Sequence, residues 1–323
     1  MWEFVRRHAK SIRRDDPRTW DKGWFSLSKL GFLGTLPILS RQMFENRVHP
    51  NLYKSFATLF DAASHSSSSS TKDDTVLHSI RFPHLRVNVG RISLMRPTRN
   101  VRFGTDRVEA DVTRWRTLEP EKWIHWDMSP FTGATTTYSW RATDFEANCD
   151  RMQLRVQGIL ALSDCGKSDG GFYCIPGGHR NLEMWARTNA TRDPTLPSKV
   201  TNPLGPCQFY LPPGDAMRRG GRKIPIRAGD LLVWTSKLPH CNYPNRSERP
   251  RIVQYVKMAS AHDRAVEPLL RESDHLLPRG FTPNALGRKL LGFDPWGNDD
   301  DHPARGVVRA EKDLAVSKEE GCV

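Results

Sequence analysis

Two short segments far apart in the chain carry the residues that most constrain its fold. The first, "WIHWDMSP", places His125 and Asp127 two residues apart, and the second, "KLPHCNYPN", contains His240. Because side chains at positions i and i+2 of a strand project from the same face, a strand would aim His125 and Asp127 together and turn Trp126 away. His240 can join them only if the chain folds back to bring its own segment alongside. The pattern therefore favours a β-rich fold in which distant strands pair.

Two histidines and one carboxylate form a ligand set suited to a ferrous ion, because together they cap one face of an octahedral centre and leave three positions open. Arg251 begins the apolar run "RIVQYVKM", eleven residues after His240. An antiparallel pair of strands would bring Arg251 back toward His240, where its planar guanidinium can hold a carboxylate through two hydrogen bonds. The four residues together indicate a non-haem iron oxygenase that uses a 2-oxo acid.

Each of these residues also has a purely structural interpretation. An H-x-D pair arises by chance in many chains, so the pair alone gives weak support to a metal site. His240 can be a buried histidine that bonds a backbone carbonyl, and Arg251 can be an arginine on an exposed strand. Gln157 lies on the polar face of the alternating segment "MQLRVQGILAL", a position that suits either solvent or a binding cavity. From the residues alone, these alternatives stay open.

Three segments resemble, in the family's own order, the phytanoyl-CoA dioxygenase (PhyH) family of Fe(II)/2-oxoglutarate oxygenases. They are "WIHWDMSP", "MQLRVQGILALSDCGKSDGGFYCIPGGHRN" and "IPIRAGDLLVWTSKLPHCNYPNRSERPRIVQYVKM". The second is similar to the family's strand, turn and glycine-rich loop, and the third keeps the family's spacing of eleven between the last histidine and the arginine. The likeness is dense over residues 86–260 and fainter toward the N-terminus.

The resemblance implies a role for each candidate residue. His125, Asp127 and His240 would bind Fe(II), and Arg251 would bind the distal carboxylate of 2-oxoglutarate. In the family, the position two residues after the last histidine often carries a small hydroxyl residue that assists the arginine. Asn242 stands there in this sequence and can still donate a hydrogen bond. The implied activity is the O2-dependent hydroxylation of an unidentified small organic substrate, with succinate and CO2 as co-products.

The resemblance also implies a fold, which is mainly β with flanking helices and has its strands arranged as a double-stranded β-helix (jelly-roll/cupin-like) barrel. Gln157 is a further candidate for the co-substrate pocket of this barrel. We expect residues 1–75 to form a helical lead-in and a Ser-rich loop. Residues 76–285 would form the oxygenase domain, with an insertion at 186–222, and residues 286–323 a poorly ordered C-terminal tail.

The charge balance leaves the partner open. The chain of 323 residues carries a formal net charge of +13, and a basic surface attracts small anions, nucleic acid and larger assemblies alike. We favour a small substrate, which the charge allows to be anionic. The alternatives are an oxygenase that acts on a macromolecule and a catalytically silent PhyH-like barrel that serves as a binding or scaffold protein.

Targeting signals are not recognisable in the sequence. No segment reaches the eighteen or so apolar residues that a membrane span requires. The six cysteines form no C-x-x-C pair, no signal peptide is visible, and the ending "EEGCV" matches neither a peroxisomal signal nor a prenylation motif. These absences predict reduced thiols and a cytoplasmic location.

Overall fold

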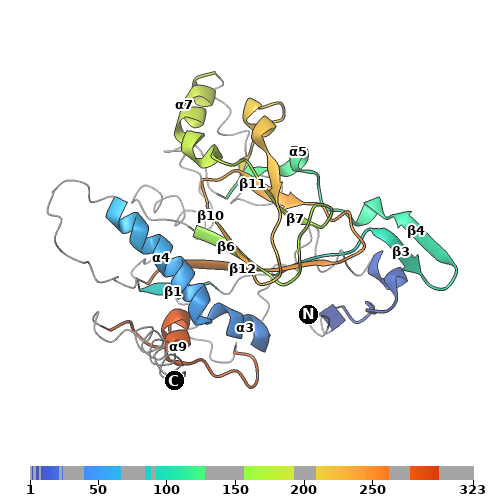
Figure 1. The fold of residues 1–323 in the computed structure, drawn as a ribbon, viewed down its shortest axis with the longest axis horizontal. Helices are drawn as coiled ribbons and strands as arrows, with labels where there is room; N and C mark the ends of the chain where they lie inside the picture. The colour runs from blue at the N-terminus through green and yellow to red at the C-terminus, as the bar shows by residue number, and fades with distance from the viewer. Residues whose placement is uncertain are drawn as a thin grey trace, which may run out of the picture. The chain divides into compact units, whose positions relative to one another are not determined.

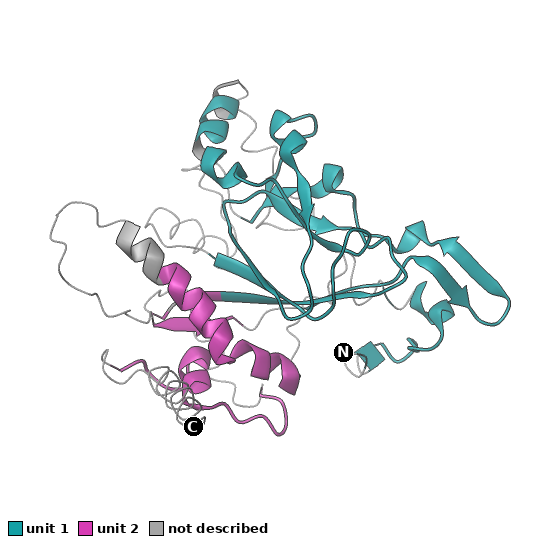
Figure 2. Cartoon of the chain, in the orientation of Figure 1, with its two compact units in different colours: residues 1–38, 89–257 teal, residues 39–88, 258–323 magenta. Residues whose placement is uncertain are grey.

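The computed structural model describes residues 2, 5–6, 9–21, 24, 40–66, 84–88, 92–127, 156–192, 209–261 and 277–297. The chain divides into two compact units, one of residues 1–38 and 89–257 and the other of residues 39–88 and 258–323 (Figure 2). Strand β12 (Arg251–Ser260) begins in the first unit and ends in the second. Within the described residues, no helix combines the length and the apolar character needed to cross a bilayer.

Two antiparallel sheets build the first unit (Figure 1). The first sheet has the order β2–β12–β6–β10 and contains β2 (Ile92–Met95), β6 (Val156–Ala161), β10 (Leu231–Thr235) and the start of β12. The second has the order β8–β5–β11–β7–β9 and contains β5 (His125–Trp126), β7 (Gly171–Cys174), β8 (Phe209–Tyr210), β9 (Arg222–Ile224) and β11 (His240–Tyr243). A separate hairpin consists of β3 (Arg99–Phe103) and β4 (Arg107–Asp111).

The two sheets face each other across an apolar cluster. Ile159 of β6, Phe172 of β7, Trp234 of β10 and Val253 of β12 belong to this one buried cluster. Since β7 lies in the second sheet and the other three strands in the first, the cluster joins both sheets. This arrangement is the mainly β fold expected from the sequence, with two facing sheets as in a double-stranded β-helix. Within the described residues, the sheets do not close into a continuous barrel.

A second apolar cluster covers the other face of the second sheet. Trp126 of β5 and Cys241 of β11 pack there with Trp123 of α5 (Pro120–Trp123) and Trp185 of α7 (Leu182–Arg192). The rings of Trp126 and Trp185 lie 4.7 Å apart. Trp126 therefore points away from its neighbours His125 and Asp127, as strand alternation predicts. Four 3-10 helices complete the described part of this unit: η1 (Pro17–Thr19), η2 (Thr113–Trp115), η3 (Gly178–Asn181) and η4 (Ala216–Gly220).

The expected insertion at residues 186–222 contributes to the second sheet. Its described parts are residues 186–192, which end α7, and residues 209–222, which contain β8 and η4. β8 pairs with β5 through His125↔Tyr210 and Trp126↔Phe209. The segment thus supplies a strand beside the predicted metal ligands. Its expected role as a lid over the substrate stays a prediction.

The second unit contains α3 (Arg41–Arg47), α4 (Pro50–Ser66), β1 (Leu85–Val87), the end of β12 and α9 (Ala285–Leu291). β1 pairs antiparallel with β12 from Leu85↔Ser260 to Val87↔Met258. The indole of Trp296 stacks on His84 and donates a hydrogen bond to the carbonyl of Leu85. These contacts hold the segment after α9 against β1.

Two local expectations differ from the structure. Helix α4 continues to Ser66, into the expected Ser-rich loop, and α9 occupies the start of the expected poorly ordered tail. α9 is stable there because Asn284 caps its first turn, Gly292 ends it with a φ of 88°, and Leu290 is fully buried. The proposed division of the chain at residues 75 and 285 stays a prediction.

Candidate metal centre

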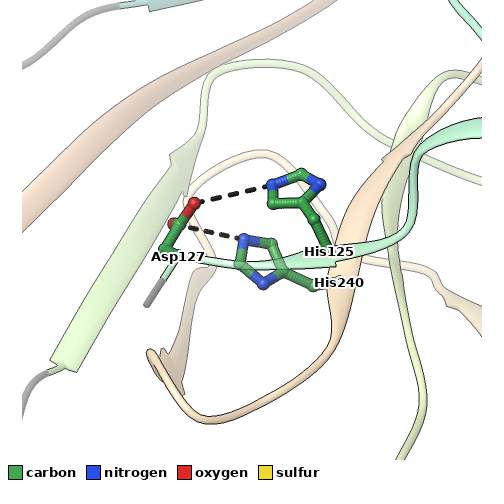
Figure 3. A group of neighbouring side chains, drawn as sticks. All are labelled: His125, Asp127 and His240. Atoms are coloured by element: carbon green, nitrogen blue, oxygen red, sulfur yellow. Dashed lines mark ion pairs between the residues drawn. The ribbon is translucent and has the colours of Figure 1, made fainter. Parts of the chain in front are cut away.

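His125, Asp127 and His240 converge within the first unit. β5 and β11 pair so that His125 and His240 are direct register partners, and Asp127 follows β5 immediately. His125 Nε2 lies 3.5 Å from Asp127 Oδ1, and His240 Nε2 lies 3.5 Å from Asp127 Oδ2 (Figure 3). One ligand atom from each residue lies within 4.8 Å of the others. Strand pairing thus brings together the two segments that the sequence keeps far apart.

Hydrogen bonds to the backbone set the orientation of both imidazole rings. His125 Nδ1 lies 2.6 Å from the carbonyl oxygen of Trp123, and His240 Nδ1 lies 2.9 Å from that of Leu238. Because a carbonyl oxygen can only accept, each Nδ1 carries the hydrogen, and each neutral ring presents its Nε2 lone pair toward Asp127. The carbonyl bond that we considered as a structural alternative for His240 is therefore present, and it orients His240 as a ligand.

The electrostatics of the three residues fit a bound cation. Two nitrogen lone pairs and a carboxylate repel one another unless a proton or a metal ion lies among them. Burial alone would raise the pKa of Asp127, but the charge of His240 and hydrogen bonds from His125 and His240 outweigh it and hold that pKa well below 3.8. The charge of Lys257 lowers it further. This donor set, two imidazoles and one carboxylate, is the one that Fe(II) oxygenases use.

The lowered pKa of Asp127 predicts how acid affects the metal-free protein. A carboxyl whose pKa is lower in the folded state contributes stability above its unfolded value, near 3.9, and loses it as the pH falls through the folded value. We expect the native protein to exceed Asp127→Asn in unfolding free energy at pH 5, and the difference to shrink steadily below about pH 4. Urea unfolding of both metal-free proteins between pH 2 and 6 measures this. A difference that is constant with pH would show that the Asp127 carboxylate is not stabilised by its two histidine neighbours.

Arg251 is fully buried, so its interpretation as an exposed strand arginine is wrong. Its Nη1 donates a hydrogen bond of 2.9 Å to Ser93 Oγ. Nε and Nη2 have no hydrogen-bond partner within the described part of the chain. A buried guanidinium with two open donors on the same edge is suited to a carboxylate that the protein itself does not supply.

The route by which Arg251 reaches the site differs from the expected one. β12, which Arg251 begins, pairs with β2 in the first sheet, whereas His240 lies on β11 in the second sheet. The two residues therefore belong to facing sheets, because the chain crosses from one sheet to the other between β11 and β12. Val253, on the same face of β12 as Arg251, packs in the cluster of Phe172, whose ring stacks 5.5 Å from the ring of His240.

Asn242 and Gln157 both lie in the interior near the three ligands. Asn242 Nδ2 donates a hydrogen bond of 3.1 Å to the hydroxyl of Tyr255, which links β11 to β12. Gln157 Nε2 donates to Asp127 Oδ2 at 2.7 Å. Gln157 is only 4% exposed, so its interpretation as a solvent-facing residue is wrong. A contact of either residue with the co-substrate stays a prediction.

Four residues near the site were not assigned from the sequence: Ser93, Ser236, Tyr255 and Lys257. Alternation along β12 could have indicated Tyr255 and Lys257, which lie an even number of positions after Arg251 and share its face. Ser93 and Ser236 carried no such signal. Their contacts with Arg251 and Gln157 depend on how separate strands pair.

Comparisons with known proteins agree with this site. A model of the family described as Phytanoyl-CoA dioxygenase (PhyH) matches residues 59–253. A Dictyostelium discoideum protein named "Putative phytanoyl-CoA dioxygenase" is 24% identical over 314 residues, which cover 91% of this chain and 79% of that protein.

Two solved structures illustrate the similarity in fold. GlcNAc Inducible Gene 2 (GIG2) from Candida albicans is 15% identical with a TM-score of 0.48, over 96% of this chain and 78% of that one. The non-heme alpha ketoglutarate dependent epimerase SnoN from nogalamycin biosynthesis is 14% identical with a TM-score of 0.34, over 69% of this chain. The chain spans 57% of the SnoN chain, less than two thirds of its length.

The family match covers more than half of the chain, and its span contains all three candidate iron ligands and Arg251. It confirms the enzyme class and the two cofactors, Fe(II) and 2-oxoglutarate, that the sequence motifs indicated. This protein therefore belongs to the phytanoyl-CoA dioxygenase (PhyH) family of Fe(II)- and 2-oxoglutarate-dependent dioxygenases.

Proposed function

We propose that this protein hydroxylates a small organic substrate, with His125, Asp127 and His240 as the iron ligands and Arg251 as the anchor of 2-oxoglutarate. Succinate and CO2 would be the co-products. The observation that carries this proposal is the convergence of two imidazole lone pairs on a buried carboxylate. A buried, incompletely bonded guanidinium in the facing sheet supports it.

The roles of the three ligands follow from their surroundings. The ferrous ion, when bound, would supply the activation of O2 and the oxidative decarboxylation of 2-oxoglutarate. His125 and His240 hold their rings in the metal-binding tautomer through the carbonyls of Trp123 and Leu238. Asp127 provides the negative charge that favours a divalent cation over a neutral group.

Arg251 has the donor arrangement needed for a dicarboxylate. Its Nε–H and Nη2–H point in parallel and can bond both oxygens of one carboxylate, while Ser93 holds Nη1 on the other side. Asn242 and its partner Tyr255 lie on the same interior faces as His240 and Arg251. We place them at the border of the co-substrate pocket.

Lys257 supports a negatively charged substrate. It is exposed, shares a face of β12 with Arg251 and Tyr255, and makes no ion pair within the described residues. Its charge nevertheless acts on Asp127, which places it near the site. We expect carboxylates to stimulate succinate formation more than their methyl esters, and Lys257→Met to reduce that preference. Equal stimulation by acids and esters would argue against an anionic substrate.

The proposed function is tested by an anaerobic titration of metal-free protein with Fe(II) and 2-oxoglutarate. We expect a visible charge-transfer band that saturates at one equivalent and disappears in His240→Ala. His179→Ala, which removes a half-buried histidine outside the ligand cluster, is the matched control and should retain the band. Absence of the band in the native protein would refute the proposal. A cytoplasmic location also stays a prediction, which cell fractionation can test.

A further inference from the structure

The side-chain amide of Gln157 connects the candidate ligand Asp127 to the opposite sheet. Gln157 Nε2 lies 2.7 Å from Asp127 Oδ2 and 3.2 Å from Ser236 Oγ. A carboxylate can only accept a hydrogen bond, so the group that faces Asp127 is the NH2 of the amide rather than its oxygen. Both N–H donors of Gln157 are thus directed to protein groups.

The surroundings of Gln157 are rigid and almost dry. Gln157 is 4% exposed and Ser236 is 1% exposed. Gln157 lies in β6 opposite Trp234 of β10, and the ring of Trp234 lies 5.1 Å from the ring of His240. Hydrogen bonds in such surroundings are stronger than in water. Asp127, in contrast, follows the two-residue strand β5 and has no ladder partner of its own.

The bond from Gln157 distinguishes the two oxygens of Asp127. It occupies a lone pair of Oδ2, which leaves Oδ1 as the oxygen with the greater freedom to bind a metal ion. A carboxylate that binds through one oxygen leaves three of six positions open, enough for a chelating 2-oxo acid and one further ligand. A carboxylate that binds through both oxygens leaves only two.

We propose that Gln157 is a positioning residue that holds Asp127 in one-oxygen coordination, with Ser236 fixing the amide of Gln157 in turn. This inference rests on the proposed metal site and assigns Gln157 to the carboxylate ligand rather than to the co-substrate. Partners that orient metal ligands typically change metal affinity by about 10- to 100-fold when they are removed.

Calorimetric titration of metal-free protein with Mn(II), followed by 2-oxoglutarate, tests the inference without turnover. Gln157→Met keeps the length of the side chain and removes its donors. We expect it to weaken Mn(II) binding about 10- to 100-fold, and to weaken 2-oxoglutarate binding to the Mn(II)-loaded protein as well. Ser236→Ala should weaken Mn(II) binding in the same direction by a smaller factor. If Gln157→Met does not fold, the result for Ser236→Ala decides.

The matched control is Thr98→Val, which removes a buried hydrogen bond to the carbonyl of Asn245. It should lower the unfolding temperature of the metal-free protein without changing Mn(II) affinity. Native Mn(II) affinity in both Gln157→Met and Ser236→Ala would show that Gln157 is merely structural and overturn the inference. If the native protein binds no Mn(II), the metal site itself fails, which is a separate and recognisable result.

Discussion

Asp127→Asn should abolish succinate formation and remove the rise in unfolding temperature that Fe(II) or Mn(II) gives the native protein. The asparagine keeps the shape of the side chain, but it lacks the negative charge that two neutral imidazoles cannot replace. Loss of a partner that only orients a ligand already costs about 10- to 100-fold in affinity, so loss of the ligand itself should exceed about 100-fold. A ligand that binds only the folded state raises stability, so thermal unfolding with and without metal reports binding directly.

Asp230→Asn is the control for this prediction. Asp230 is exposed and accepts a hydrogen bond from the backbone N–H of Arg227 in the turn before β10. Its substitution should leave metal binding and succinate formation at native levels. Native metal affinity in Asp127→Asn would mean that the ligand assignment is wrong, whatever the effect on turnover.

Arg251→Met should weaken 2-oxoglutarate binding severely and stabilise the protein in the absence of 2-oxoglutarate. Truncating one partner of a buried, hydrogen-bonded charge pair costs about 2–5 kcal/mol, which corresponds to about 30-fold or more in Kd. In the free protein the same guanidinium is buried with two donors unbonded, and replacing such a charge by an apolar side chain is often neutral or stabilising. The two effects should therefore have opposite signs.

Calorimetry of 2-oxoglutarate binding to Mn(II)-loaded protein measures the first effect, and thermal unfolding measures the second. Arg251→Lys should also bind weakly, because an ammonium group cannot engage two carboxylate oxygens in parallel. Arg249→Met, two residues earlier, removes an exposed arginine that pairs with Asp169 and should leave 2-oxoglutarate binding unchanged. If Arg251→Met bound 2-oxoglutarate as the native protein does, the carboxylate would be anchored elsewhere.

Much of the site could be predicted because its signals are local. The i, i+2 spacing places His125 and Asp127 on one face, and the same alternation turns Trp126 and Cys241 into the opposite apolar cluster. The glycine-rich and apolar segments between the two histidines identified the family. None of this required knowledge of which strands pair.

The connection between the ligands and their partners could not be predicted in the same way. Arg251 faces His240 from the opposite sheet rather than from a paired strand, and Gln157 is hydrogen-bonded to Asp127 rather than directed to solvent. Ser93 lies far from Arg251 in the chain, yet it bonds its guanidinium. Each of these relations depends on strand register, and a shift of one residue would move every side chain to the other face.

The sequence by itself therefore determined the chemistry of the centre: two histidines, one carboxylate and an arginine, on strands of a mainly β fold. Residue type and short-range alternation are sufficient for that, because they decide what a side chain can bind and which face it occupies. Only the tertiary structure decided the order in which the strands pair, the tautomers of His125 and His240, and the donor that holds Asp127. These features arise from contacts between segments whose proximity results from packing the two sheets together, and no local pattern in the chain encodes that packing.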